Sequence, residues 1–113
     1  MCTKSELQTV AQSVVQTTME LLADKIYKII LYGSYARGDF TSESDIDIMI
    51  ILNCSEEETR TYRRAVNRLA SRISLANDIE VSLLLIDKQS FEERMDILPF
   101  YQNVQKEGVA LYG

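Results

Sequence analysis

Histidine is absent from this chain of 113 residues, and cysteine occurs only twice. A catalytic triad that uses imidazole is therefore excluded within the chain. Cys2 and Cys54 lack the spacing of metal ligands, so we expect two unpaired thiols and no transition-metal site built on cysteine. The ligands that remain are carboxylate, hydroxyl and carbonyl oxygens, which suit magnesium, manganese or calcium.

Positive charge and long apolar runs are also scarce. The net charge of −5 argues against broad binding of nucleic acid, which draws on a positive field. The longest apolar runs have the length of a strand, so no membrane span is expected. The first residues lack the apolar block of a secretion signal, which makes the cytoplasm the expected location. The length predicts a single domain over residues 1–113.

Hydrophobic periodicity predicts helices and strands that alternate along the chain. Ser5 and Ser55 each open a capping box, the sequence pattern of a helix start. The first helix should turn four apolar residues toward the core, namely Leu7, Val10, Val14 and Leu21. The predicted helices span 5–24, 55–75 and 88–98, with shorter helical turns from 34 and at 100–106, and the predicted strands span 26–32, 45–52, 79–86 and 109–112.

The predicted helix over 55–75 carries an apolar stripe and a basic row on opposite sides. The apolar stripe consists of Tyr62, Val66, Leu69 and Ile73. The basic row consists of Arg60, Arg64, Arg68 and Arg72, spaced by four residues. We expect this row to face solvent, with an acidic partner or nucleic acid as the alternative.

Three carboxylates begin the polar faces of two predicted strands. Asp45 and Asp47 share one face of the strand 45–52, and Glu80 has the matching position in the strand 79–86. The helix between the two strands makes them parallel, so the three carboxylates should converge at one end of the sheet. The turn Gly33-Ser34 ends the strand 26–32, which must run antiparallel to its neighbour to bring that turn to the same place. We therefore predict a mixed sheet.

Carboxylates held this close repel each other unless a cation lies between them. Two unit charges about 4 Å apart cost about 4 kcal/mol at an effective dielectric constant near 20. Two divalent cations would remove that conflict, activate an attacking hydroxyl group and neutralise a leaving pyrophosphate. In such a site Asp45 and Asp47 would be shared ligands, and Glu80 would be the third ligand or the general base.

The order Gly33-Ser34, ten residues (35–44) and then Asp45-Ile46-Asp47 resembles the signature of the nucleotidyltransferase superfamily typified by DNA polymerase beta. The local sequence is most similar to the minimal nucleotidyltransferases of bacteria and archaea. The resemblance implies an α/β (α+β) fold, with a small mixed sheet and helices packed on it. Many minimal members carry aspartate as the third acid, whereas this chain offers Glu80, as do some antibiotic-modifying relatives.

The resemblance also implies a substrate, cofactors and a partner. The substrate would be ATP or another nucleoside triphosphate, bound with two Mg²⁺ or Mn²⁺ ions. The family's gene partner is often a helical HEPN protein, which receives AMP in a toxin–antitoxin pair. The residues implied are Asp45, Asp47 and Glu80 for catalysis and metal binding, and Gly33, Ser34, Arg37 and Ser44 for nucleotide binding.

Two other functions are compatible with the sequence. A non-catalytic module could neutralise a partner protein by binding alone, which would suit the small size of the chain and the glutamate in the third acidic position. An enzyme that modifies an aminoglycoside or a similar small molecule is the other alternative. Such enzymes usually carry a helical domain over the acceptor, so here a homodimer would have to supply the walls of the acceptor site.

Overall fold

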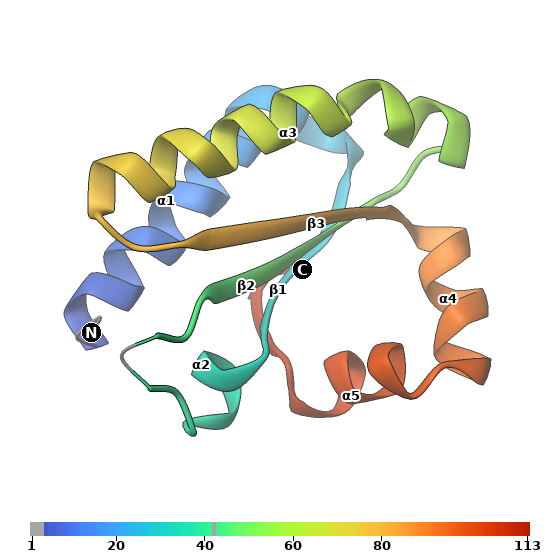
Figure 1. Cartoon of the computed structure of the whole chain (residues 1–113). Helices are drawn as coiled ribbons and strands as arrows, with labels where there is room; N and C mark the ends of the chain where they lie inside the picture. Colours follow the sequence, from blue (N-terminus) through green and yellow to red (C-terminus); the bar gives the residue numbers. More distant parts are fainter. Residues whose placement is uncertain (1–3, 42) are drawn as a thin grey trace.

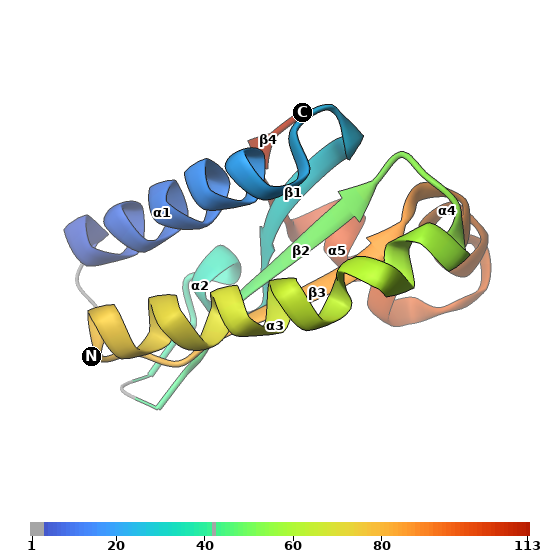
Figure 2. The same cartoon turned by 90° about the horizontal axis from the view of Figure 1, so that it is seen from above.

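A four-stranded sheet lies between two layers of helices in the computed structural model, which describes residues 4–41 and 43–113 (Figure 1). The elements in chain order are α1 (Lys4–Leu22), the 3₁₀ turn η1 (Ala23–Lys25), β1 (Ile26–Tyr32), α2 (Ser34–Arg37), β2 (Ile46–Leu52), α3 (Glu56–Asn77), β3 (Val81–Asp87), α4 (Lys88–Ile97), α5 (Pro99–Glu107) and β4 (Val109–Tyr112). Helices α1 and α3 cover one face of the sheet, and α4 and α5 cover part of the other (Figures 1 and 2).

The sheet is mixed, as the sequence predicts. Its strand order is β3-β2-β1-β4. β1 is antiparallel to both β2 and β4, whereas β2 and β3 are parallel and are joined through α3. This arrangement brings the end of β1, the start of β2 and the start of β3 to the same end of the sheet (Figure 1).

β2 is the central strand and is buried on both faces. Ile46, Ile48, Ile50 and Leu52 pack in the cluster beneath α1 and α3, and none of them has measurable exposure to solvent. The residues between them face the second cluster, which includes Phe91 of α4 and Tyr101 of α5. Two buried faces explain why this strand is almost uniformly aliphatic.

The capping signal at Ser55 is confirmed. The Ser55 hydroxyl accepts a hydrogen bond from the backbone N–H of Glu58 at 3.0 Å, and α3 begins at the next residue. The predicted apolar stripe faces the core, with Val66, Leu69 and Ile73 buried and Tyr62 half-buried. The four arginines of the basic row are exposed, as expected for a row on the opposite side of α3.

The predicted packing of α1 is wrong in one place. Leu21 was expected in the core, but 45% of its surface is exposed. The buried residues of α1 are Val10, Val14, Thr18 and Leu22, which follow each other at intervals of four. The chain leaves the α-helix at Leu22 and continues in the 3₁₀ turn η1, so the helix ends two residues earlier than predicted. Ser5, predicted as the cap, lies inside α1.

Cys54 is a free, half-buried thiol whose sulfur lies 3.3 Å from the Thr59 hydroxyl. Cys2, the other thiol expected to be unpaired, lies outside the described residues. Within residues 4–41 and 43–113, no helix combines the length and the apolar character needed to cross a membrane.

Candidate active site

Two aspartates at the start of β2 form the centre of the candidate site. Asp45 immediately precedes β2 and Asp47 is its second residue. The residues on either side of Asp47, Ile46 and Ile48, are fully buried beneath α1 and α3. Because successive side chains of a strand alternate, Asp45 and Asp47 both face the opposite side of the sheet. The predicted shared face of this pair is therefore confirmed.

The environment of Asp47 disfavours its charged form. Its carboxylate is half-buried, and burial is the largest influence that raises its pKa. The negative charge of Asp45 raises the pKa of Asp47 further, whereas Arg37 acts in the opposite direction. A nearby cation would relieve both the desolvation and the repulsion, so the pair suits a positively charged ligand.

Gly33 allows the turn after β1 to approach Asp47 closely. A Cβ atom at this position would lie 2.5 Å from Oδ2 of Asp47, closer than any side chain tolerates. The backbone of Gly33 has φ 77° and ψ −157°, a region that only glycine occupies readily. The backbone conformation favours glycine, and the close contact shows that the predicted Gly33-Ser34 turn lies directly beside Asp47.

The turn leads into α2, a single helical turn that starts at Ser34. The Gly33 carbonyl accepts hydrogen bonds from the N–H groups of Ala36 and Arg37, both at 3.1 Å. Among the described residues, no side chain caps the start of α2. An anion bound beside Gly33 and Ser34 would occupy the place that a capping side chain takes elsewhere.

Arg37 and Ser44 brace the loop between α2 and β2. The Arg37 guanidinium lies 3.1 Å from a carboxylate oxygen of Asp39 and 3.7 Å from one of Glu107, and these partners raise its pKa. The Ser44 hydroxyl accepts a hydrogen bond from the backbone N–H of Thr41 at 2.8 Å. Binding of a nucleotide by either residue stays a prediction.

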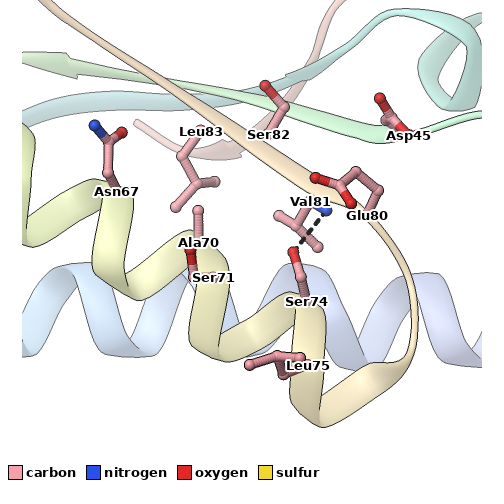
Figure 3. A pocket seen from close by; sticks show the side chains of 10 residues that line it. All are labelled: Asp45, Asn67, Ala70, Ser71, Ser74, Leu75, Glu80, Val81, Ser82 and Leu83. Atoms are coloured by element: carbon pink, nitrogen blue, oxygen red, sulfur yellow. Dashed lines mark hydrogen bonds between the residues drawn. The ribbon is translucent and has the colours of Figure 1, made fainter.

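The expected convergence of three carboxylates is not found. The parallel register aligns Glu80 with Asp45, and the Ile46 N–H donates to the Glu80 carbonyl at 2.9 Å. However, no group of three acidic, histidine or cysteine residues among residues 4–41 and 43–113 lies close enough to hold one metal ion. Glu80 precedes β3, and its long side chain folds back over the start of that strand (Figure 3). Its catalytic role stays a prediction.

An open cavity of about 630 Å³ lies between α3 and the start of β3, and of the two aspartates only Asp45 lines it. Asp45, Glu80 and Ser82 line its side toward the sheet, and polar residues of α3 line the other side (Figure 3). Ser74 of α3 holds the two elements together, because its hydroxyl accepts a hydrogen bond from the Val81 N–H at 2.9 Å.

Two residues at the site escaped the sequence interpretation. Tyr32 pairs with Asp47 across β1 and β2, and burial together with that carboxylate raises the pKa of its phenol to about 12. Ser82 pairs with Asp47 from the other side, across β2 and β3. The position of Tyr32 directly before the Gly33 turn was a usable signal, whereas the register of Ser82 required the structure.

The donor set fits a hard divalent cation, although it consists of two carboxylates and not of the three that the sequence predicts. Asp45 and Asp47 offer carboxylate oxygens on one face. Burial and, second to it, the charge of Asp45 raise the pKa of Asp47, and a cation would offset both effects. Magnesium is commonly held by one or two carboxylates together with the phosphates of a substrate. Two carboxylates are thus sufficient for a metal that arrives with a nucleotide.

Comparison with known proteins identifies the family of this chain. Residues 15–111 match the model of the nucleotidyltransferase domain. The chain is also similar to "Putative protein adenylyltransferase MJ0141" of Methanocaldococcus jannaschii, with 41% identity over 68 residues that make up 60% of this chain and 67% of that protein.

Two solved structures share the fold. One belongs to a toxin–antitoxin complex with AMP-PNP, with a TM-score of 0.59 and 23% identity, over 91% of this chain and 73% of that chain. The other belongs to a complex of a tri-AMPylated HEPN toxin of Shewanella oneidensis with an MNT antitoxin, with a TM-score of 0.54 and 22% identity, over 95% of this chain and 72% of that chain. With the match over residues 15–111, the mixed sheet and the aspartate pair, the chain belongs to the nucleotidyltransferase domain family.

Proposed function

We propose that this protein transfers AMP from magnesium-bound ATP to a hydroxyl group on a partner protein. The observation that carries the proposal is the close approach of the Gly33 turn to Asp47, whose carboxylate also feels the charge of Asp45. The turn would hold the terminal phosphates, and the aspartates would hold the metal ion that offsets the charge of the phosphates. These two functions have to lie side by side, and the antiparallel pairing of β1 and β2 brings them together.

The reaction forms one bond and breaks one. The acceptor oxygen bonds to the α-phosphorus of ATP, the bond from that phosphorus to the oxygen bridging toward the β-phosphate breaks, and pyrophosphate leaves with the electron pair. Mg²⁺ bound at the aspartates would polarise the α-phosphoryl group and offset the charge of pyrophosphate. The proton of the acceptor hydroxyl would pass to water or to Glu80, which lines the cavity beside Asp45.

We also propose that the two substrates bind on different sides of β2. The proposed phosphate turn follows β1, on one side of β2, whereas β3 and the open cavity lie on the other side. An in-line displacement needs the attacking hydroxyl opposite the leaving pyrophosphate. The acceptor would therefore approach over β3, and the nucleotide would lie toward α2.

A protein acceptor is supported by the names of similar proteins. The relative from Methanocaldococcus jannaschii is named as a protein adenylyltransferase, and one structure of the same fold contains an AMPylated HEPN toxin. We propose a helical HEPN protein as the partner of this chain, which would then act as an antitoxin by modifying it.

The test uses ATP labelled on different phosphates. The protein is incubated with Mg²⁺, with a purified HEPN protein as acceptor and with ATP labelled on either the α- or the γ-phosphate. We expect the α-label, and not the γ-label, to appear on the partner, and we expect Asp45→Asn and Asp47→Asn to abolish labelling. Labelling from the γ-phosphate would indicate a kinase, and labelling by both variants at the wild-type rate would remove the aspartates from the mechanism.

A binding module without activity is the second candidate, because three carboxylates do not converge among the described residues. In that case the chain would neutralise its partner by occupying a surface of it. The two candidates separate in a neutralisation assay with the Asp45→Asn, Asp47→Asn double variant. Full neutralisation by a folded double variant supports binding alone, and loss of neutralisation with retained partner binding supports the enzyme.

A further inference from the structure

The register of the parallel strands places Ser82 beside Asp47. Asp47 and Ser82 are partners across β2 and β3, whereas Glu80 and Asp45 each lie just before the first residue of their strand. Neighbouring strands lie about 4.8 Å apart, so the two side chains start close together. Ser82 thus occupies the position on β3 nearest to the centre of the proposed metal site.

The packing of β3 confirms which way Ser82 faces. Its neighbours Val81 and Leu83 belong to the core beneath α1 and α3, and Leu84 belongs to the opposite cluster beneath α4 and α5. Ser82 therefore lies on the face that carries Asp47. In Figure 3 the oxygens of Ser82 and Asp45 both point away from α3, and the Ser82 side chain is exposed.

Glu80 has the charge of a third ligand but not the position. It stands before the first residue of β3, and its carboxylate folds back over the start of the strand (Figure 3). With Asp45 and Asp47 it forms no group close enough to hold one metal ion within residues 4–41 and 43–113. The carboxylate that the site lacks would have to come from the position of Ser82.

We infer that Ser82, and not Glu80, is the third residue of the metal site, so that the site offers two carboxylates and one neutral hydroxyl. This inference rests on the proposed function of Asp45 and Asp47 as metal ligands. A hydroxyl oxygen attracts a divalent cation less than a carboxylate does, because metal affinity rises with the number of charged ligands. The protein alone binds the cation weakly, and a nucleoside triphosphate supplies the missing charge and oxygens.

Titration with Mn²⁺ tests this inference without measuring activity. Free Mn²⁺ is followed by its paramagnetic resonance signal in the wild-type chain and in Ser82→Asp, Ser82→Asn and Glu80→Gln. We expect Ser82→Asp to lower the Kd for Mn²⁺ at least tenfold, and Ser82→Asn and Glu80→Gln to stay within about twofold of wild type. Ser71→Asp is the matched control, because it adds a carboxylate to the same cavity from α3.

The outcomes separate this inference from the proposed function. A Kd of Ser82→Asp within twofold of wild type overturns the inference, and so does a Kd raised tenfold in Glu80→Gln. Equal gains in Ser71→Asp and Ser82→Asp also overturn it, because they reflect a general effect of charge. If the Asp45→Asn, Asp47→Asn double variant binds Mn²⁺ like wild type, the proposed metal site itself fails. Should Ser82→Asp melt at room temperature, Ser82→Glu serves as the test variant.

Discussion

Replacing Asp47 by asparagine should stabilise the fold at neutral pH. The half-buried Asp47 carboxylate lies on the same face as Asp45, and burial and the charge of Asp45 both raise its pKa. A side chain two residues further along a strand starts about 6.6 Å away. At that distance the repulsion is about 2.5 kcal/mol at an effective dielectric constant of 20 and about 0.6 kcal/mol in water. We therefore expect Asp47→Asn to raise the free energy of unfolding by about 1 kcal/mol.

The gain should depend on pH in a defined direction. A carboxyl group with a raised pKa in the folded state binds more protons there than in the unfolded chain, so stability falls as the pH rises through this range. The penalty is complete above the raised pKa of Asp47 and absent below the unfolded value of about 4. Asp47→Asn should consequently melt several degrees higher than wild type at pH 7 and equally at low pH.

Thermal unfolding followed by circular dichroism, at low salt and without divalent cations, provides the measurement. Asp96→Asn is the matched control, because it removes one exposed carboxylate from α4, and its Tm should stay at the wild-type value. An Asp47→Asn protein that melts below wild type at pH 7, or that gains as much at low pH, would refute the electrostatic argument. It would show that Asp47 stabilises the fold through contacts of its own.

Three further predictions concern the surroundings of the site and the helix that supports it. Gly33→Ala should cost about 1 to 3 kcal/mol in the free energy of unfolding, because a side chain at φ 77° and ψ −157° is strained and would collide with Asp47; urea titration measures the loss, and an unchanged midpoint would contradict it. Ser55→Ala should lower the free energy of unfolding by about 1 kcal/mol, because the backbone N–H of Glu58 loses its acceptor. Urea titration measures this loss, and an unchanged free energy of unfolding would show that the Ser55 cap does not stabilise the fold. In a titration of tyrosine absorbance, Tyr32→Phe should remove the phenol that ionises near pH 12. If the variant still shows an ionisation near pH 12, that ionisation belongs to another tyrosine.

The sequence predicted the sheet well because its signals were local and mutually consistent. β1 occurs where predicted, at Ile26–Tyr32, since a run of β-branched and aromatic residues ends at a glycine turn. Parallel pairing of β2 and β3 followed from the helix between them, and antiparallel pairing of β1 followed from the need to bring Gly33 to the aspartates. These arguments depend only on alternation and chain connectivity.

The sequence could not predict which side chain near the start of β3 lies beside the aspartates. Glu80 has the same parity as Ser82, so alternation alone could not choose between them as the partner of the aspartates. The choice depends on the register, which aligns Asp47 with Ser82, and on the bend of the chain just before β3. The prediction for Leu21 was wrong because the buried residues of α1 follow each other at intervals of four up to Leu22, so Leu22 and not Leu21 faces the core.

The most direct test of the central claim is the binding of α,β-methylene-ATP, an analogue that cannot donate AMP, measured by calorimetry with and without Mg²⁺. If the turn at Gly33-Ser34 and the pair Asp45 and Asp47 form one site, the wild-type protein should bind the analogue at least tenfold more tightly with Mg²⁺. The Asp45→Asn, Asp47→Asn double variant should then bind equally weakly with and without the metal. Binding by the double variant that is as tight and as dependent on Mg²⁺ as that of the wild type would contradict the account.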